Sequence, residues 1–408
     1  MTETWALAAL WLGLALLATL LSIWLRVATA LSEIVVGTVA QLVIGALLGA
    51  TVLGKDAGWI MFLSGTGAIF LTFMAGAELD PDVFKLKWKE ASAIGLAGFL
   101  APFLGCAAIA FYVLHWDVRA SWLTGVALST TSVAVVYAVM LEFGLNNTRF
   151  GKTLLAACFI NDLGTVLALG LLFAPFTYRT AIFAGVSVAV FAFLPWLTPR
   201  FFKRYGGRPS ELEAKYLLLF LFGMGALAAW ADSEAVLPAY LIGMVLAGTV
   251  GRDHQLIRRL RTLTFGLLTP FYFIRAGSFV SVPALIGAPM AFVILLLAKM
   301  ATKYVSVYPA TRLFAHSRRD GMYTTLLMST GLTFGSISAL FGLTHKIITT
   351  SQYSFLVAAV IASAVVPTLI ANAFYLPRHL LNNNNGDEPA AVETEVSAAP
   401  APAQEEST

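Results

Sequence analysis

Charged residues are scarce in this chain. Asp, Glu, Lys and Arg make up 12% of its 408 residues, whereas 59% are hydrophobic. A soluble domain usually carries about 25% charged residues. No water-soluble fold of this size could bury so much apolar surface, so lipid must be the solvent for most of it. The net charge of +4 is small and gives no reason to expect a nucleic-acid partner.

The residue patterns of common enzymes are missing as well. The two cysteines, Cys106 and Cys158, lie in apolar runs and are interpreted as packing residues, not as a disulfide framework. The sequence has no Walker motif, nucleophile elbow, zinc-ligand spacing or dinucleotide fingerprint. It also has no TVGYG filter of the kind found in potassium channels. We therefore expect neither an enzyme nor an ATP-driven pump, and we expect no cofactor.

Apolar runs, by contrast, are abundant. Thirteen of them come near the roughly 20 residues that a helix needs to cross a bilayer. They lie at about 4–25, 33–53, 58–78, 91–114, 120–141, 151–174, 180–198, 214–231, 235–251, 262–281, 284–308, 320–342 and 353–377. We expect an all-α polytopic membrane protein with 13 transmembrane helices. The first run follows no basic region and precedes no clear cleavage site, which favours a retained span over a signal peptide.

Basic residues are distributed unevenly between the loops. With this span count, 19 of them fall in loops on one side and four on the other. The positive-inside rule places the richer side in the cytoplasm. We therefore expect the N-terminus outside and the C-terminus in the cytoplasm, in a bacterial-type plasma membrane or an internal energy-coupling membrane. Residues 382–408 hold six acids and no base, which predicts a disordered acidic cytoplasmic tail.

Two stretches of the chain resemble each other. Ala127–Leu145 reads ALSTTSVAVVYAVMLEFGL and Met328–Leu343 reads MSTGLTFGSISALFGL, so Ser-Thr and Phe-Gly-Leu recur. The two lie seven spans apart and must cross in opposite directions, which is the mark of an inverted repeat as in secondary transporters. Their polar and small residues predict two crossing broken helices whose freed backbone groups face a cavity. Close packing of small residues is the alternative. The polar positions of the second stretch are Ser329, Thr330 and Thr333.

One acid stands out. Among the 22 acids, only Asp162 falls deep in a predicted span. A carboxylate at mid-bilayer costs about 3 kcal/mol on insertion scales, so it usually faces the protein interior or a water-filled path. Such an acid can exchange a proton for a metal ion, and Asn161 beside it adds an oxygen of the kind that hard cations prefer. Hydroxyls of Thr130, Thr131 or Ser132 could complete a site for a monovalent cation. A protonated structural acid is the alternative.

Three basic residues also fall inside predicted spans. Lys299 and Lys303 are four residues apart and share a helical face. Either could compensate the charge of Asp162 or hold the broken helices through backbone carbonyls. For Lys303 the favoured alternative is extension toward a lipid headgroup. Arg275 marks either a structural ion pair or a turn near an interface. The five histidines lie in loops or at span ends and are expected at the surface.

Several segments together resemble a known family. They are Ile34–Gly49 IVVGTVAQLVIGALLG, Leu71–Val83 LTFMAGAELDPDV, Ala127–Val135 ALSTTSVAV, Ile160–Leu167 INDLGTVL, Leu237–Gly248 LPAYLIGMVLAG, Thr269–Gly277 TPFYFIRAG and Val365–Ile370 VVPTLI. In order and spacing they resemble the monovalent cation:proton antiporter-2 family of Na⁺/H⁺ and K⁺/H⁺ exchangers. The resemblance covers nearly all of residues 30–378.

The resemblance implies a fold and a function. The fold would have thirteen spans, with a mobile core at about 91–174 and 284–377 and a dimer scaffold at about 4–78 and 214–281. Asp162 would be the family's ion-binding aspartate, Asn161 its partner and Lys299 the lysine of span 11. The core would slide past the scaffold as an elevator, carrying Na⁺, K⁺ or Li⁺ one way and H⁺ the other.

Two departures from the family pattern matter. Electrogenic relatives carry two adjacent aspartates, but here the first is Asn161, which favours electroneutral exchange. Asn-Asp is also the pairing of the other large antiporter branch, yet that branch's glutamate is replaced by Ala157. The tail is too short for the nucleotide-binding domain of potassium-efflux relatives, which favours sodium. A K⁺/H⁺ antiporter and, less so, a cation channel stay open as alternatives.

Overall fold

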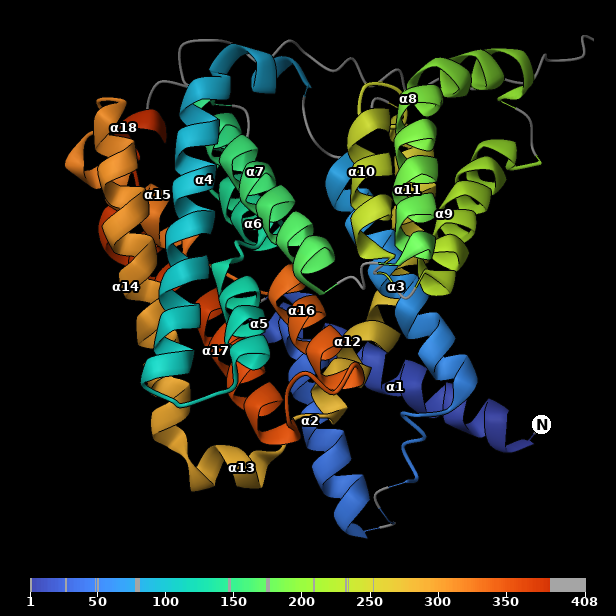
Figure 1. Cartoon of the computed structure of the whole chain (residues 1–408), viewed down its shortest axis with the longest axis horizontal. Helices are drawn as coiled ribbons and strands as arrows, with labels where there is room; N and C mark the ends of the chain where they lie inside the picture. The colour runs from blue at the N-terminus through green and yellow to red at the C-terminus, as the bar shows by residue number, and fades with distance from the viewer. Residues whose placement is uncertain are drawn as a thin grey trace, which may run out of the picture.

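The computed structural model describes residues 2–381 apart from 26–27, 48, 50, 78–80, 146–147, 174–176, 208–209, 232, 234 and 252. Over these residues the chain forms helices and no strands. Figure 1 shows two groups of helices. One holds α4 to α7 and α14 to α17, and the other holds α3 and α8 to α11. Helices α2 and α12 lie between the groups, and α1 runs from there to the N mark at the right.

The helices follow one another with short connections. In chain order they are α1 (Thr2–Leu25), α2 (Thr29–Leu47), α3 (Gly58–Ala77), α4 (Pro81–Tyr112), α5 (Val118–Ser129), α6 (Val133–Glu142), α7 (Arg149–Phe173), α8 (Tyr178–Tyr205), α9 (Leu212–Trp230), α10 (Val236–Leu246), α11 (His254–Leu263), the π-helix η1 (Thr264–Leu268), α12 (Thr269–Ser278), α13 (Val282–Gly287), α14 (Pro289–Leu313), α15 (Arg318–Met328), α16 (Thr333–Thr344), α17 (Thr350–Ile370), the π-helix η2 (Ala371–Tyr375) and α18 (Arg378–Leu381).

Ten helical segments among the described residues are long and apolar enough to cross a membrane. The three other predicted spans coincide with shorter or interrupted helices: α5 with α6, α10 alone, and α11 with η1 and α12. The all-α membrane class is thus confirmed, whereas the count of thirteen crossings stays a prediction.

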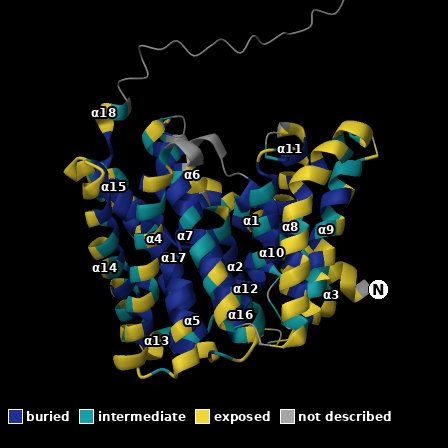
Figure 2. Ribbon diagram, turned by 45° about the horizontal axis from the view of Figure 1, so that its top comes forward, coloured by how far each residue is buried: buried dark blue, intermediate teal, exposed yellow. Residues whose placement is uncertain are grey.

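Apolar side chains face outward over much of the bundle. Figure 2 shows buried residues along its middle and exposed residues along the outer faces of α8 and α9. On α8, Val188 and Phe193 are large apolar residues that are 67% and 64% exposed. In water such a face would be costly, but lipid tails cover it at no cost. The burial pattern therefore agrees with the apolar composition.

Glycines set the helix crossings on the α3 side of the molecule. A Cβ on Gly37 of α2 would overlap the carbonyl of Ile274 in α12, and one on Gly277 of α12 would overlap the carbonyl of Ile34 in α2. Gly76 of α3 and Gly243 of α10 meet in the same way, each against the other helix's backbone. Small residues at such points let two helix backbones touch. The backbones of these helix pairs are therefore in direct contact at the glycines.

Candidate ion-binding site

The two interruptions predicted from the repeat are present, and they meet. The first helix stops after Ser129, leaves residues 130–132 outside any helix and resumes at Val133. The second stops after Met328 and resumes at Thr333. The backbone N–H of Ser132 donates to the carbonyl of Thr330 at 3.1 Å. The hydroxyl of Thr131 donates to the carbonyl of Met328 at 2.7 Å. The breaks α5/α6 and α15/α16 thus form one crossing.

The remaining hydroxyls of the crossing bond mostly within their own helix ends, although Thr330 also accepts the N–H of Ser132 across the crossing at 3.4 Å. Thr130 donates to the carbonyl of Ala127 at 3.1 Å, Thr330 to Leu327 at 2.7 Å and Ser329 to Thr325 at 2.7 Å. The Ser132 hydroxyl accepts from the N–H of Val135 at 3.4 Å, and Thr333 begins α16. Each of these hydroxyls keeps lone pairs, so each is an oxygen that a cation can use.

The carboxyl group of Asp162 lies in the interior of α7. Asp162 is 1% exposed and Asn161 is fully buried. Within the described part of the chain, both carboxyl oxygens of Asp162 and both polar atoms of the Asn161 amide have no hydrogen-bond partner. A buried polar group without a partner costs roughly 1–3 kcal/mol, and more when charged. Native proteins rarely keep four such atoms together unless a ligand or proton uses them.

Helix α7 packs closely against α4 and contacts the crossing, where Cys158 Sγ lies 3.6 Å from Met328 Sδ. A Cβ on Gly95 of α4 would overlap the carbonyl of Ala157, and a Cβ on Gly98 would sit 3.4 Å from Nδ2 of Asn161. On another face of α7, the hydroxyl of Tyr240 in α10 donates to the carbonyl of Phe159 at 3.0 Å. Contacts on both faces therefore hold in place the part of α7 that carries Asp162.

Lys303 is part of the crossing. It is fully buried, and its ammonium group donates to Thr131 at 2.9 Å, the same hydroxyl that bonds Met328. Extension of Lys303 toward a lipid headgroup, which the sequence favoured, is therefore wrong. A lysine can snorkel only near a helix end, and Lys303 is in the middle of α14.

Lys299 lies one turn earlier on α14 and is also fully buried. A Cβ on Gly331 would overlap its ammonium nitrogen and lie 2.9 Å from the Thr130 hydroxyl. Lys299 Nζ has no hydrogen-bond partner among the described residues. The amine thus lies against the non-helical stretch of the second break. Any side chain in place of Gly331 would displace the amine from its present position.

Arg275 lies at the end of α12, near a loop. Its Nε donates to the carbonyl of Lys55 at 2.8 Å, Asp56 is 3.9 Å away and its guanidinium lies over the ring of Phe279. These contacts join α12 to the segment before α3. They fit the structural-pair interpretation of Arg275 from the sequence.

Two acids escaped the sequence analysis. Glu33 lies inside α2 and is 2% exposed; the span was predicted to begin at residue 33, which left this acid at a presumed boundary. Glu90 of α4 accepts from His316 at 2.7 Å, and the two side chains are only 11% and 13% exposed. His316 is therefore not the surface residue that was expected. A pair 226 residues apart leaves no mark in a linear sequence.

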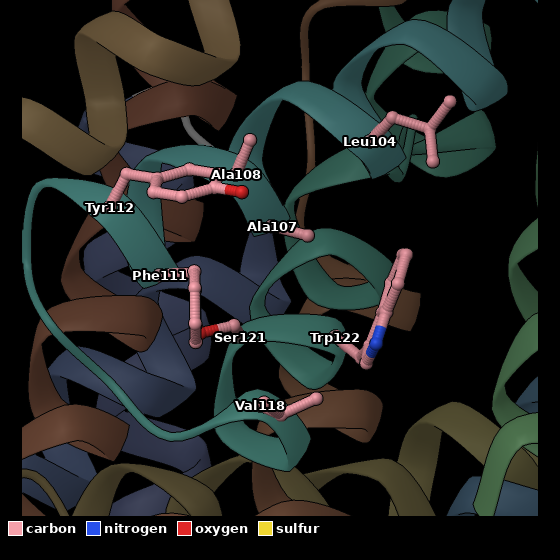
Figure 3. Close-up of a pocket in the computed structure, with 8 residues that line it drawn as sticks. All are labelled: Leu104, Ala107, Ala108, Phe111, Tyr112, Val118, Ser121 and Trp122. Atoms are coloured by element: carbon pink, nitrogen blue, oxygen red, sulfur yellow. The ribbon is translucent and has the colours of Figure 1, made fainter.

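A cavity of about 280 Å³ lies elsewhere, where α4 ends and α5 begins. Figure 3 shows that Leu104, Phe111 and Trp122 line it with apolar surface. It contains no acid, so it does not suit a cation. Across the described residues there is also no cluster of three or more His, Cys, Asp or Glu side chains that could hold a metal ion. Besides the carboxylate of Asp162 itself, the cation site predicted there would have to rely on amide, hydroxyl and carbonyl oxygens.

Comparison with known proteins gives consistent results. The family model described as "Sodium/hydrogen exchanger, transmembrane" matches residues 12–374. "Probable Na(+)/H(+) antiporter 3" of Methanocaldococcus jannaschii is 24% identical over 333 residues, which is 77% of this chain and 84% of that protein. The "Na(+)/H(+) antiporter" of Enterococcus hirae is 25% identical over 354 residues, 82% of this chain and 91% of that protein.

A plant relative and a solved structure extend the comparison. "Cation/H(+) antiporter 17" of Arabidopsis thaliana is 29% identical over 279 residues, 61% of this chain but only 34% of that longer protein. The structure of the sodium proton antiporter MjNhaP1 from M. jannaschii matches with a TM-score of 0.69 at 16% identity, covering 93% of this chain and 98% of the other. That likeness shows a shared fold.

Proposed function

Because the chain belongs to the sodium/hydrogen exchanger family of integral membrane proteins, we propose that it exchanges a monovalent cation for protons across a membrane, with Asp162 as the group that binds both. It is a transporter and not an enzyme. The transported cation favoured here is sodium, in line with the names of the archaeal and enterococcal relatives. Potassium is the alternative cation, and a channel is the less favoured mode of transport.

One observation carries this proposal. Five polar atoms around the crossing are buried without hydrogen-bond partners among the described residues: the two carboxyl oxygens of Asp162, the two amide atoms of Asn161 and Nζ of Lys299. A carboxylate and an amide oxygen are the ligand types that hard cations prefer. A proton on Asp162 or a cation beside it would remove the cost of leaving these oxygens unpaired. The two ligands compete for one carboxylate, which is the chemical requirement for exchange.

We assign roles to the residues around Asp162 according to the contacts that each one makes. Thr130, Thr131 and Ser132 supply hydroxyl oxygens at the first break, and Ser329, Thr330 and Thr333 supply them at the second. Lys303 compensates charge near Asp162 and holds Thr131. Lys299, over Gly331, is the positive charge that a bound cation would have to face. Arg275 supports the fold at the end of α12.

We further propose that exchange follows an elevator mechanism with thirteen spans. The core, about 91–174 and 284–377, would carry the crossing and move against a scaffold of about 4–78 and 214–281 that forms a homodimer. The close glycine crossings on the scaffold side support a rigid partner for such motion. The protein would lie with its N-terminus outside and its C-terminus in the cytoplasm, in a plasma or internal energy-coupling membrane.

The test uses everted vesicles loaded by respiration and a pH-sensitive dye. Addition of Na⁺ should dissipate the proton gradient, and Asp162→Asn should abolish this response. Glu33→Gln is the matched control, because it makes the same change at another buried acid and should retain exchange. A response that persists in Asp162→Asn would refute the assignment. A response to K⁺ but not to Na⁺ would replace the cation and keep the site.

Stoichiometry needs a second test. With one acid at the crossing we propose exchange of one proton for one cation, which moves no net charge. Proteoliposomes with equal Na⁺ and equal pH on both sides should then develop no pH difference when a potassium diffusion potential is applied. Proton movement driven by voltage alone would rule out electroneutral exchange.

A further inference from the structure

Helix α11 differs from every long helix of the bundle in its side chains. Its sequence HQLIRRLRTL places Leu256, Ile257 and Leu260 in the interior, at 3%, 8% and 2% exposure. Arg258, Arg259 and Arg261 are exposed on the other face. The apolar face is thus used to hold α11 on the protein. The arginines are exposed, and the ion pair of Arg259 with Glu211 places α11 beside the segment that joins the end of α8 to the start of α9.

The end of α8 has the same character. Beyond its exposed apolar part, Arg200, Lys203 and Arg204 follow within five residues and are all exposed. Arg200 lies over the ring of Trp196 at 4.3 Å and Arg204 over Tyr205 at 5.6 Å. Tryptophan and tyrosine gather where the apolar part of a bilayer meets its headgroups. This part of α8 therefore marks the headgroup level.

Together these segments form a surface that we name the basic rim. It consists of exposed bases from α8, α9 and α11, namely Arg200, Lys203, Arg204, Lys215, Arg258, Arg259 and Arg261.

The acids beside the basic rim are already engaged. Glu211 pairs with Arg259 at 2.9 Å, Glu213 accepts the N–H of Gly207 at 2.6 Å, and Asp253 caps the first turn of α11. In contrast, Lys203, Arg204 and Arg258 form no ion pair with any described residue. Like charges gathered on one surface repel one another, and bound anions relieve that repulsion.

We propose that the basic rim binds the phosphate groups of anionic phospholipids in the adjacent leaflet. Clusters of four to eight Lys and Arg directly beside a membrane span attract such headgroups, at about 1 kcal/mol per base. The rim satisfies three requirements at once: enough bases, aromatic residues at the headgroup level, and rigid support from the buried face of α11. The proposal concerns a surface away from Asp162 and does not rest on the ion that is exchanged.

One other occupant has the right charge. Residues 382–408 carry six acids and no base. Aromatic residues favour the lipid, because Trp196 and Tyr205 offer a bilayer boundary an apolar ring and a polar edge. An acidic peptide gains nothing comparable from them. The test below includes the tail as an outcome.

The experiment uses purified full-length protein and native mass spectrometry. Dioleoyl phosphatidylglycerol and dioleoyl phosphatidylcholine are added separately, and the apparent affinity for each is measured. The rim variant is Lys203→Gln with Arg204→Gln and Arg258→Gln. The matched control removes the same charge from exposed bases of α4 and α15, with Lys89→Gln, Arg318→Gln and Arg319→Gln.

The expected result is a roughly tenfold or larger loss of affinity for phosphatidylglycerol in the rim variant, since three bases are removed. Affinity for phosphatidylcholine and the behaviour of the control should not change. Equal losses in rim and control variants would mean that net charge alone matters and would overturn the proposal, as would no loss in either.

Two further variants guard the conclusion. The variant Lys203→Arg with Arg204→Lys and Arg258→Lys keeps the charge, so it should keep its affinity for phosphatidylglycerol. Retained affinity would show that substitution at these positions does not by itself misfold the protein. Changing the six tail acids to amides in the full chain tests the other occupant. If, with the tail acids changed, the rim variant and the protein with an intact rim bind phosphatidylglycerol equally well, then the tail is the partner of the basic rim and the proposal is refuted.

Discussion

The two lysines of α14 should respond in opposite ways to the same substitution. Lys303 donates to Thr131 at 2.9 Å, whereas Lys299 Nζ has no hydrogen-bond partner among the described residues. Both are fully buried. Methionine has nearly the length of lysine and fills the same space without charge. The perturbation is therefore Lys303→Met against Lys299→Met.

The magnitude follows from these contacts. Loss of a hydrogen bond to a charged donor costs roughly 1.5–3 kcal/mol, so Lys303→Met should be destabilising by about that amount. Removing an unpartnered buried amine relieves a penalty of roughly 1–3 kcal/mol, so Lys299→Met should be neutral or stabilising. The two variants should differ by about 4 kcal/mol in unfolding free energy, taken as the sum of central values.

The assay is unfolding of the purified protein in one detergent by titration with SDS, followed by tryptophan fluorescence. A double-mutant cycle of Lys303→Met with Thr131→Val isolates the bond between the two side chains, since the coupling should vanish if the bond is absent. The reasoning is refuted if Lys299→Met proves as destabilising as Lys303→Met, because the Lys299 amine would then stabilise the folded state despite having no hydrogen-bond partner.

Three other outcomes are expected. Asn161→Asp places a second carboxyl beside Asp162, so exchange should become sensitive to voltage. One net charge moved per cycle at 100 mV is worth about 2.3 kcal/mol, which corresponds to roughly a 50-fold cation gradient. The measurement is made in proteoliposomes under a potassium diffusion potential. Gly277→Ala should sharply reduce the monodisperse fraction in size-exclusion chromatography, whereas Gly266→Ala, where a Cβ meets nothing within 4 Å, should not. Burial lowers the pKa of Lys55 in the folded chain below 10.5, its ordinary value. Between the folded and the unfolded pKa the unfolded chain binds more protons, so the free energy of unfolding should rise with pH across that window. A melting series with no such rise, or with the same rise in Lys55→Met, would contradict this.

Features that depend on residues close together in the chain could be predicted from the sequence, whereas contacts between distant residues could not. The breaks at residues 130–132 and 329–332 were predictable, because Ser, Thr and Gly in an apolar run compete locally with helix formation. Asp162 was predictable because a charge in an apolar segment is costly wherever the segment packs. Both signals are carried by neighbours in the chain.

Interactions between distant residues were not predictable. Lys303 looked free to extend to a headgroup because nothing in its own span shows Thr131, 172 residues away. Glu33 was missed because the run was expected to begin at that residue, whereas α2 begins at Thr29. Sequence patterns place helix ends only within a few residues. The Glu90–His316 pair needed the fold itself.

The crossing has a consequence for how permanent the broken helices are. A break in a single helix could close by forming the missing backbone bonds. Here the N–H of Ser132 bonds the carbonyl of Thr330, and the Thr131 hydroxyl bonds the carbonyl of Met328. If either segment rewound into a continuous helix, it would withdraw these partners and strand the other in the interior. Each break therefore stabilises the other, because the two unwound segments satisfy each other's backbone groups.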